Sequence, residues 1–140
     1  MATRILVVND TQEILDLFRI LLEDEGYEVI LSSYPLQTVK QVEQIAPELI
    51  ILDLMFGDEK FGFQMLEMLK LSRATMSIPV IVCTAALQAV REMEGYLVSK
   101  GIAVVYKPFD IDELIKVVSQ ALETQKNTMF RVKNEGDHAK

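Results

Sequence analysis

The sequence predicts a single α/β domain, a doubly wound sheet of five parallel strands with five helices. Strand-like and helix-like segments alternate five times along the chain. Three of the strand-like segments are continuous apolar runs, which is typical of strands covered by helices on both faces. The chain has 140 residues, of which 50% are hydrophobic. That size fits one domain with a substantial core, which we place at residues 1–125.

The five expected strands are short and rich in aliphatic side chains. We expect them at residues 4–8, 28–31, 49–52, 80–83 and 102–106. The fourth strand contains Cys83, the single cysteine of the chain, so no internal disulfide is expected. Its place in an apolar strand favours a buried thiol over a reactive one.

The first two expected helices have clear boundary signals. The first carries apolar residues at helical spacing from Ile14 to Leu22 and is expected to stop at Gly26. The second is expected to begin near Pro35, because proline suits the first turn of a helix, and to end at Pro47.

The remaining helices follow the same periodic pattern. The third spans Phe63 to Leu69, and the fourth is expected as one helix from Leu87 to Leu97 with Gly101 as its stop. The last opens with Asp110 and Glu113, which stand at the spacing of a capping box, and its apolar positions run to Leu122.

Beyond about residue 124 the apolar periodicity fades. Residues 126–140 are expected to form a polar tail, which could be disordered or an added strand or arm, and which is too short for an output domain. The formal net charge is −7 although this tail is basic, so the body is strongly acidic and is not expected to bind nucleic acid directly. The apolar runs are too short to span a membrane, and the first residues lack a signal-peptide pattern. We therefore expect no membrane contact and a cytoplasmic location.

Four polar residues follow the ends of apolar strands. Asp10 comes after the first strand, Asp53 after the third, Thr84 after the fourth and Lys107 after the fifth. Because the carboxyl ends of parallel strands meet at one edge of a sheet, we expect these side chains to gather there. Two carboxylates, a hydroxyl and an ammonium can hold a divalent cation beside a phosphorylated carboxylate.

These residues in this order, closed by Lys107-Pro108-Phe109, resemble the receiver domain of two-component response regulators over roughly residues 3–124. The resemblance implies a flavodoxin-like sheet with strand order 2-1-3-4-5. Because the tail is too short for an output domain, we expect a single-domain regulator, which by the resemblance would be a switch rather than a conventional enzyme. Its partners would be a sensor histidine kinase or histidine phosphotransfer protein in a phosphorelay, and a downstream protein. A homodimer is compatible with the resemblance.

The resemblance also assigns roles to the strand-end residues. Asp53 would be the phosphoacceptor. The expected Mg²⁺ ligands are Asp10, Asp53 and the backbone carbonyl of Met55, with Asn9 contributing through a water molecule. The phosphoryl group would be contacted by the hydroxyl of Thr84, the backbone amide of Ala85 and the ammonium of Lys107. The Lys107-Pro108 peptide bond is expected to be cis.

Each of these residues also has a plainer structural interpretation. A lone Asp53 would be read as a strand-end carboxylate that caps a turn. Asp10 could cap the first helix, because Glu13 follows three residues later. Thr84 could be the N-cap of the fourth helix, and Lys107 could be a solvated loop lysine. The ordered set of four favours the functional interpretation.

The chain departs from the family pattern at three places. Asn9 stands where most receivers have a second acid, so we expect weaker Mg²⁺ affinity. Val104 stands where many receivers have an aromatic switch residue; Tyr106 shares its expected face and could substitute, which makes Thr84, Val104 and Tyr106 the switch candidates. The loop over residues 55–62 is slightly longer than usual and adds acids at Asp58 and Glu59.

Two other functions remain as alternatives. A pseudo-receiver that docks a partner without being phosphorylated is favoured by Asn9 and Val104 and disfavoured by the retained strand-end set. A flavodoxin-like cofactor-binding enzyme is disfavoured because residues 9–13 contain no glycine to cradle a phosphate, and Asp10 would repel one. A purified protein without flavin absorbance would exclude it.

Overall fold

The computed structural model describes the backbone of residues 2–138 and the side chains of residues 2–124. The described residues form one parallel sheet of five strands with the order β2-β1-β3-β4-β5, as predicted. The strands are β1 (Arg4–Val8), β2 (Glu28–Ser32), β3 (Leu49–Leu52), β4 (Val80–Thr84) and β5 (Ala103–Tyr106). Each observed strand boundary lies within one residue of the predicted one.

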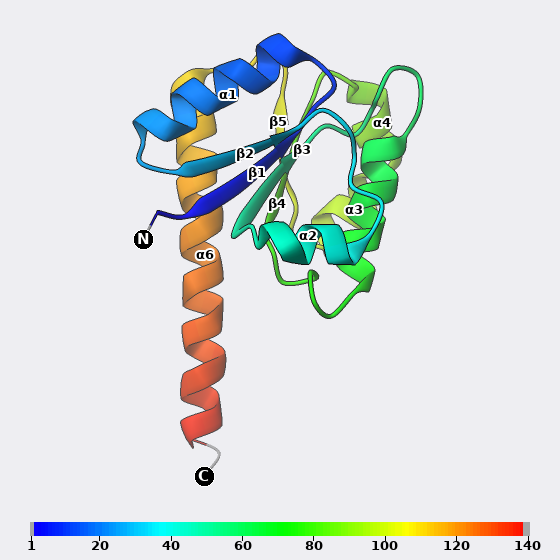
Figure 1. Ribbon diagram of the computed structural model, residues 1–140. Helices are drawn as coiled ribbons and strands as arrows, with labels where there is room; N and C mark the ends of the chain where they lie inside the picture. Colours follow the sequence, from blue (N-terminus) through cyan, green and yellow to red (C-terminus); the bar gives the residue numbers. More distant parts are fainter. Residues whose placement is uncertain (1, 139–140) are drawn as a thin grey trace.

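Helices cover both faces of the sheet (Figure 1). One face carries α1 (Gln12–Asp24) and α6 (Ile111–His138). The other carries α2 (Val39–Ile45), α3 (Phe61–Leu71), α4 (Leu87–Glu92) and α5 (Glu94–Ser99). Successive side chains of a strand point to opposite faces. In β1, Ile5 and Val7 therefore pack in the core with Phe18 and Leu114, whereas Leu6 packs in the second core beneath α3.

The strand register aligns the carboxyl ends of the central strands. Val8 lies opposite Leu52, and Leu52 lies opposite Val82 on the next strand. All four residues of β3 are buried, with exposures of 0–1%. Fully burying one such side chain contributes about 1.5–3 kcal/mol, so a shift of this register would be costly. The polar residues that follow β1 and β3 are thereby brought to one edge.

The expected fourth helix is divided into two, so the described residues contain six helices rather than five. The division falls at Met93, whose backbone angles of φ −116° and ψ 17° leave the helical range. Val90, Met93 and Leu97 are nonetheless all buried in the same core. Apolar spacing alone could not show the division, because the periodic positions continue through it.

Helix α2 begins at Val39, four residues later than the prediction from Pro35. Thr38 and Gln41 form a reciprocal capping box, in which the Thr38 hydroxyl accepts from the Gln41 amide at 3.2 Å and the Gln41 side chain accepts from the Thr38 amide at 3.2 Å. These bonds satisfy free amides at the helix start and so set its first residue. The helix ends before Pro47, as predicted, with Ala46 in the left-handed region at φ 53°.

Helix α6 continues through residues 126–138, which we expected to form a separate polar tail. It begins as predicted, because the Asp110 carboxylate accepts from the amides of Asp112 (2.8 Å) and Glu113 (3.3 Å). The helix then projects beyond the body of the domain (Figure 1). Helix propagation adds one hydrogen bond per residue once the packed part has formed, so the loss of apolar periodicity did not mark a helix end. Across the described chain, none of the helices combines the length and apolarity needed to cross a membrane.

Candidate functional site

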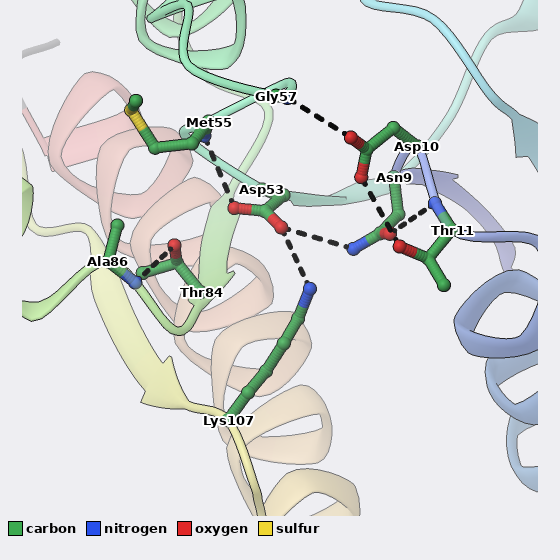
Figure 2. A network of polar contacts seen from close by, with 9 residues as sticks. All are labelled: Asn9, Asp10, Thr11, Asp53, Met55, Gly57, Thr84, Ala86 and Lys107. Atoms are coloured by element: carbon green, nitrogen blue, oxygen red, sulfur yellow. Dashed lines mark hydrogen bonds and ion pairs between the residues drawn. The ribbon is translucent and has the colours of Figure 1, made fainter.

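The strand-end residues named from the sequence lie at the carboxyl edge of the sheet, where Figure 2 shows their side chains around Asp53. Asn9 and Asp10 follow β1, and Asp53 follows β3. Thr84 ends β4, and Lys107 follows β5. Four different strands therefore contribute to one polar site, as the prediction required.

Asp53 is at the centre of the site and is 8% exposed. Its Oδ2 accepts from the Lys107 ammonium at 2.8 Å and from the Asn9 side-chain amide at 3.4 Å, while its Oδ1 accepts from the Met55 backbone amide at 3.3 Å. A buried carboxylate is costly unless its charge is paired and hydrogen-bonded. These three donors from three segments hold the carboxylate in one place at the strand end.

Lys107 is positioned by the backbone on both sides of it. Its amide donates to the Thr84 carbonyl at 2.9 Å, which extends the pairing of β4 and β5 by one bond. The Lys107-Pro108 peptide bond is cis, as expected from the resemblance. The ring of Phe109 packs against Phe18 of α1 at a centroid distance of 5.4 Å. The lysine side chain is only 17% exposed and points at Asp53 rather than into solvent, so its interpretation as a solvated loop lysine was wrong.

Asp10 is exposed and is held by the loop that follows β3. Its Oδ2 accepts from the Gly57 backbone amide at 3.2 Å, and its Oδ1 accepts from the Thr11 hydroxyl at 3.4 Å. Gly57 has φ 63° at the tip of a turn that Phe56 and Glu59 close with two backbone hydrogen bonds, and glycine favours that conformation. The longer loop thus reaches over the edge of the sheet to the Asp10 carboxylate.

The expectation that Asp10 caps α1 was wrong. The N-cap residue is Thr11, which makes no capping bond with its own side chain. The Asn9 side-chain oxygen instead accepts from the Thr11 amide at 2.9 Å. Asn9 therefore bridges the start of α1 and the carboxylate of Asp53, and it does so without adding charge.

The donor set fits Mg²⁺ in its chemistry. Asp10 and Asp53 supply hard carboxylate oxygens, and the Met55 carbonyl lies on the adjoining loop. Lys107 is the single cation paired with Asp53 among the described ion pairs, so two carboxylates face one positive charge. Within residues 2–124, no group of three or more His, Cys, Asp or Glu side chains could enclose a metal. Magnesium, which keeps several water ligands, suits such an open pair of carboxylates.

Thr84 lies on the opposite side of Asp53 from Asn9 and is 1% exposed (Figure 2). Its hydroxyl oxygen accepts from the Ala86 amide at 3.1 Å. The N-cap of α4 is Ala86 and not Thr84, so the simple capping interpretation was wrong by two residues. Ala85 is exposed between them, and its carbonyl accepts from the Leu87 amide at 3.0 Å. The segment after Thr84 is a tight turn that leads directly into α4.

The other switch candidates lie on β5. Val104 packs against the core beneath α3, whereas Val105 lies in the core beneath α1 and α6. Tyr106 is 44% exposed. The alternation agrees with the predicted shared face of Val104 and Tyr106.

Gly62 is a residue of the site whose importance the sequence analysis missed. A Cβ atom at this position would lie 1.7 Å from the Asp53 carbonyl oxygen and 2.9 Å from the Leu54 carbonyl carbon. The next residue, Phe63, donates its amide to the Leu54 carbonyl at 3.2 Å. The first turn of α3 thus rests on the backbone of Asp53, which only glycine permits. A glycine at the start of an apolar helix, directly after the loop that follows Asp53, was the available signal.

Two further expectations concern residues near the site. Cys83 is buried, as predicted, and burial raises the pKa of its thiol to about 12, so the thiol stays protonated at neutral pH. Asp58 and Glu59 are exposed on the turn that contacts Asp10, in agreement with their interpretation as loop residues. Lys60 pairs with Glu92 at 3.4 Å and connects this loop to α4.

Comparison with known proteins identifies the class to which this fold and site belong. The family model of the response regulator receiver domain matches residues 5–119. The chain therefore belongs to the response regulator receiver domains of two-component systems. The described fold is also similar to the solved structure of a CheY-like receiver domain protein from Methanospirillum hungatei, with a TM-score of 0.77, 26% identity and coverage of 91% of this chain and 99% of that one. A receiver domain of a DNA-binding response regulator from Colwellia psychrerythraea gives a TM-score of 0.72 at 26% identity, covering 86% and 98% of the two chains.

Longer relatives share the same domain. The DNA-binding response regulator MtrA of Mycolicibacterium smegmatis is 28% identical over 137 residues, which cover 98% of this chain and 58% of MtrA. The DNA-binding dual master transcriptional regulator RpaA of Synechocystis is 34% identical over 119 residues, which cover 85% of this chain and 48% of RpaA. The chain thus spans about half the length of these relatives.

Proposed function

We propose that this receiver domain accepts a phosphoryl group on Asp53 from a phosphorylated histidine and signals through protein contacts that depend on this modification. The observation that carries the proposal is the buried Asp53 carboxylate, which the Lys107 ammonium meets at 2.8 Å at the open edge of the sheet. Phosphoryl transfer to a carboxylate requires a fixed nucleophile and positive charge at the transferred group. Both requirements are supported by this arrangement.

In the proposed reaction, an Asp53 oxygen attacks the phosphorus atom of a phosphohistidine. A P–O bond forms, the P–N bond breaks, and the imidazole leaves with the electron pair of that bond. Lys107 transfers its contact from the carboxylate to a phosphoryl oxygen, and the Thr84 hydroxyl and Ala85 amide donate to the phosphoryl group. Mg²⁺ held by Asp10, Asp53 and the Met55 carbonyl, with Asn9 acting through a water molecule, supplies further positive charge.

The proposed partners follow from this chemistry and from the surface. The donor is a sensor histidine kinase or a histidine phosphotransfer protein. The downstream protein docks on the face of α4, β5 and the start of α6, where Leu87, Tyr106 and Ile111 are 46%, 44% and 49% exposed. The acidic charge disfavours direct nucleic-acid contact by this domain. We further propose a cytoplasmic switch that is not a conventional enzyme.

The test is intact mass after incubation with acetyl phosphate, with and without Mg²⁺. We expect one phosphoryl adduct that requires Mg²⁺, is absent in Asp53→Ala and is retained in Asp58→Asn, which removes an exposed acid from the neighbouring loop. Asp10→Asn should lower the yield at limiting Mg²⁺. An adduct that persists in Asp53→Ala would refute the assignment of the acceptor.

A second candidate function is a pseudo-receiver that docks a partner without phosphorylation. The observation that favours it is Asn9, whose side chain is bonded to Asp53 and to the Thr11 amide and brings no charge to the cation site. Val104 adds to it by replacing an aromatic switch residue. If neither acetyl phosphate nor a phosphorylated histidine donor modifies the folded protein in Mg²⁺, this second function is the better one.

A further inference from the structure

A second polar feature lies at the opposite edge of the sheet, at the amino ends of β4 and β5. It is a pocket of about 590 Å³ between these strand ends, the loops before them and the second half of the packed part of α6. Its lining includes Lys70, Lys100, Pro79, Ala103, Val117 and Ala121. Val80 in the pocket wall and Thr84 in the phosphoacceptor site are four residue steps apart along β4, which is about 13 Å of strand. The two sites are therefore separate.

The charge of the pocket is opposite to that of the protein. The chain carries a net charge of −7, yet the lining residues within the described side chains, 2–124, include two lysines and no carboxylate. Neither Lys70 nor Lys100 belongs to an ion pair among the described residues. Two ammonium groups beside an apolar wall form a local positive field that attracts an anion.

The lysines are also held in place. The Lys70 ammonium donates to the carbonyls of Met76 at 3.3 Å and Ile78 at 3.1 Å, and an ammonium has three donors, so one remains for a ligand. The Lys100 ammonium lies 6.0 Å from the centroid of the Tyr96 ring. Burial lowers the pKa of Lys70, and the positive charge of Lys100 lowers it further. A negative group between the two would offset this repulsion.

The size and the remaining lining define the rest of the ligand. Sites for small molecules commonly have volumes of about 300–1,000 Å³, with mostly apolar walls and a few polar groups that orient the ligand. Here the apolar wall is formed by Pro79, Val80, Ala103, Val117 and Ala121. A ligand that matches both parts has one anionic end and an apolar body.

We propose that this pocket binds a small amphiphilic anion, a carboxylate joined to an apolar chain or ring, with the carboxylate between Lys70 and Lys100. The apolar part lies against the side chains of β4, β5 and α6. Such a ligand would give the receiver domain a second input that is separate from phosphorylation. The proposal does not depend on the chemistry proposed for Asp53.

Sodium octanoate is a suitable probe, and its binding to the full chain can be followed by the amide resonances of ¹⁵N-labelled protein. We expect saturable binding at one site, with shifts at Gly101, Ala103 and Val117 and none at Asp10 or Gly57. Lys100→Gln should weaken binding at least tenfold. Lys116→Gln, which removes an exposed lysine of α6 outside the pocket, should leave it unchanged.

A neutral ligand of the same length shows how much of the binding affinity comes from the charge and how much from the apolar chain. We expect 1-octanol to bind at least tenfold more weakly than octanoate. The absence of saturable binding up to millimolar octanoate in the folded protein would overturn the proposal. Equal affinities of octanoate and 1-octanol, equal affinities of wild type and Lys100→Gln, or shifts confined to other surfaces would overturn it as well.

Discussion

The two halves of the carboxyl edge of the sheet are built differently. The half at β1 and β3 adjoins α1 and α3, which have 13 and 11 residues. Because Gly62 has no side chain, α3 packs directly against the Asp53 backbone. In the half at β4 and β5, α6 covers one face of the sheet, and the other face carries α4 and α5, which have six residues each and are separated at Met93. Its apolar side chains Leu87 and Tyr106 are about half exposed.

This difference suggests that the proposed phosphoryl transfer takes place in the β1 and β3 half and that the resulting structural change occurs in the β4 and β5 half. The acidic half holds its carboxylates with backbone amides and a lysine, so the proposed phosphoryl transfer would meet an Asp53 carboxylate that is already held in place. Short helices have little stability of their own, and regions with few buried contacts rearrange at low cost. The β4 and β5 half is therefore suited to change when Asp53 is modified. Four substitutions test this comparison.

The largest expected effect comes from Gly62→Ala. The added methyl group would overlap the Asp53 carbonyl oxygen, and backbone atoms cannot move aside without shifting β3 or α3. We expect a loss of about 3 kcal/mol in the free energy of unfolding, at the upper end of the cost of overpacking. Urea denaturation measures it.

Gly95→Ala is the matched control in the other half. Nothing lies within 4 Å of a Cβ atom at this position in α5, so the substitution should raise the free energy of unfolding by about 0.5–1 kcal/mol. If the two substitutions changed stability equally, the contrast between a tightly packed half and a loosely packed half would be wrong.

Asn9→Asp tests the charge of the acidic half. The substitution replaces the amide that donates to Asp53 by a second carboxylate, so the metal-free protein should lose stability while Mg²⁺ binds about tenfold more tightly, which corresponds to about 1.4 kcal/mol. Titration calorimetry with MgCl₂ gives the affinities. Equal affinities in the two proteins would show that Asn9 does not limit cation binding.

Thr84→Val probes the other half. Valine matches threonine in shape but cannot accept from the Ala86 amide, so we expect the free energy of unfolding to fall by about 1 kcal/mol. Thr84→Ser keeps the hydroxyl and should retain that hydrogen bond. If urea denaturation showed Thr84→Val to be as stable as wild type, the hydrogen bond from the Ala86 amide would not be the source of stability at this position.

The smallest effect is expected from Tyr106→Ala. The ring is 44% exposed, so the free energy of unfolding should change by no more than about 0.5 kcal/mol, and the yield of the Asp53 adduct should be unchanged. Tyr34→Ala, which removes another exposed tyrosine two residues after β2, is the control. Loss of the adduct in Tyr106→Ala alone would place Tyr106 in the chemistry instead of the response.

Sequence patterns were sufficient to predict the strands, because a buried strand must be made of apolar residues. The five strands were predicted within one residue of each boundary, because each is a short, mostly apolar segment bounded by polar or turn residues. The strand order and the meeting of Asp10, Asp53, Thr84 and Lys107 at one edge came from the resemblance combined with the geometry of parallel sheets. The burial of Cys83 was predicted from the same apolar pattern.

Helix boundaries that depend on local hydrogen bonds could not be predicted from the periodicity of apolar residues. The start of α2 was decided by the Thr38 and Gln41 capping box rather than by Pro35. The apolar spacing continues through Met93, so it does not show the division between α4 and α5. The spacing fades after about residue 124, so it does not show that α6 continues to His138. Local hydrogen bonds and packing of the backbone decided these boundaries.

The sequence by itself determined which polar residue stands at the end of each strand: an acid, a hydroxyl or a lysine. Only the tertiary structure decided how those groups are bonded, with Asn9 joined to Asp53, Asp10 held by Gly57, and Gly62 of α3 against the Asp53 backbone. The physical reason is distance. Apolar alternation acts between neighbours along the chain, whereas these contacts join loops that lie near each other only after the sheet has aligned its strand ends.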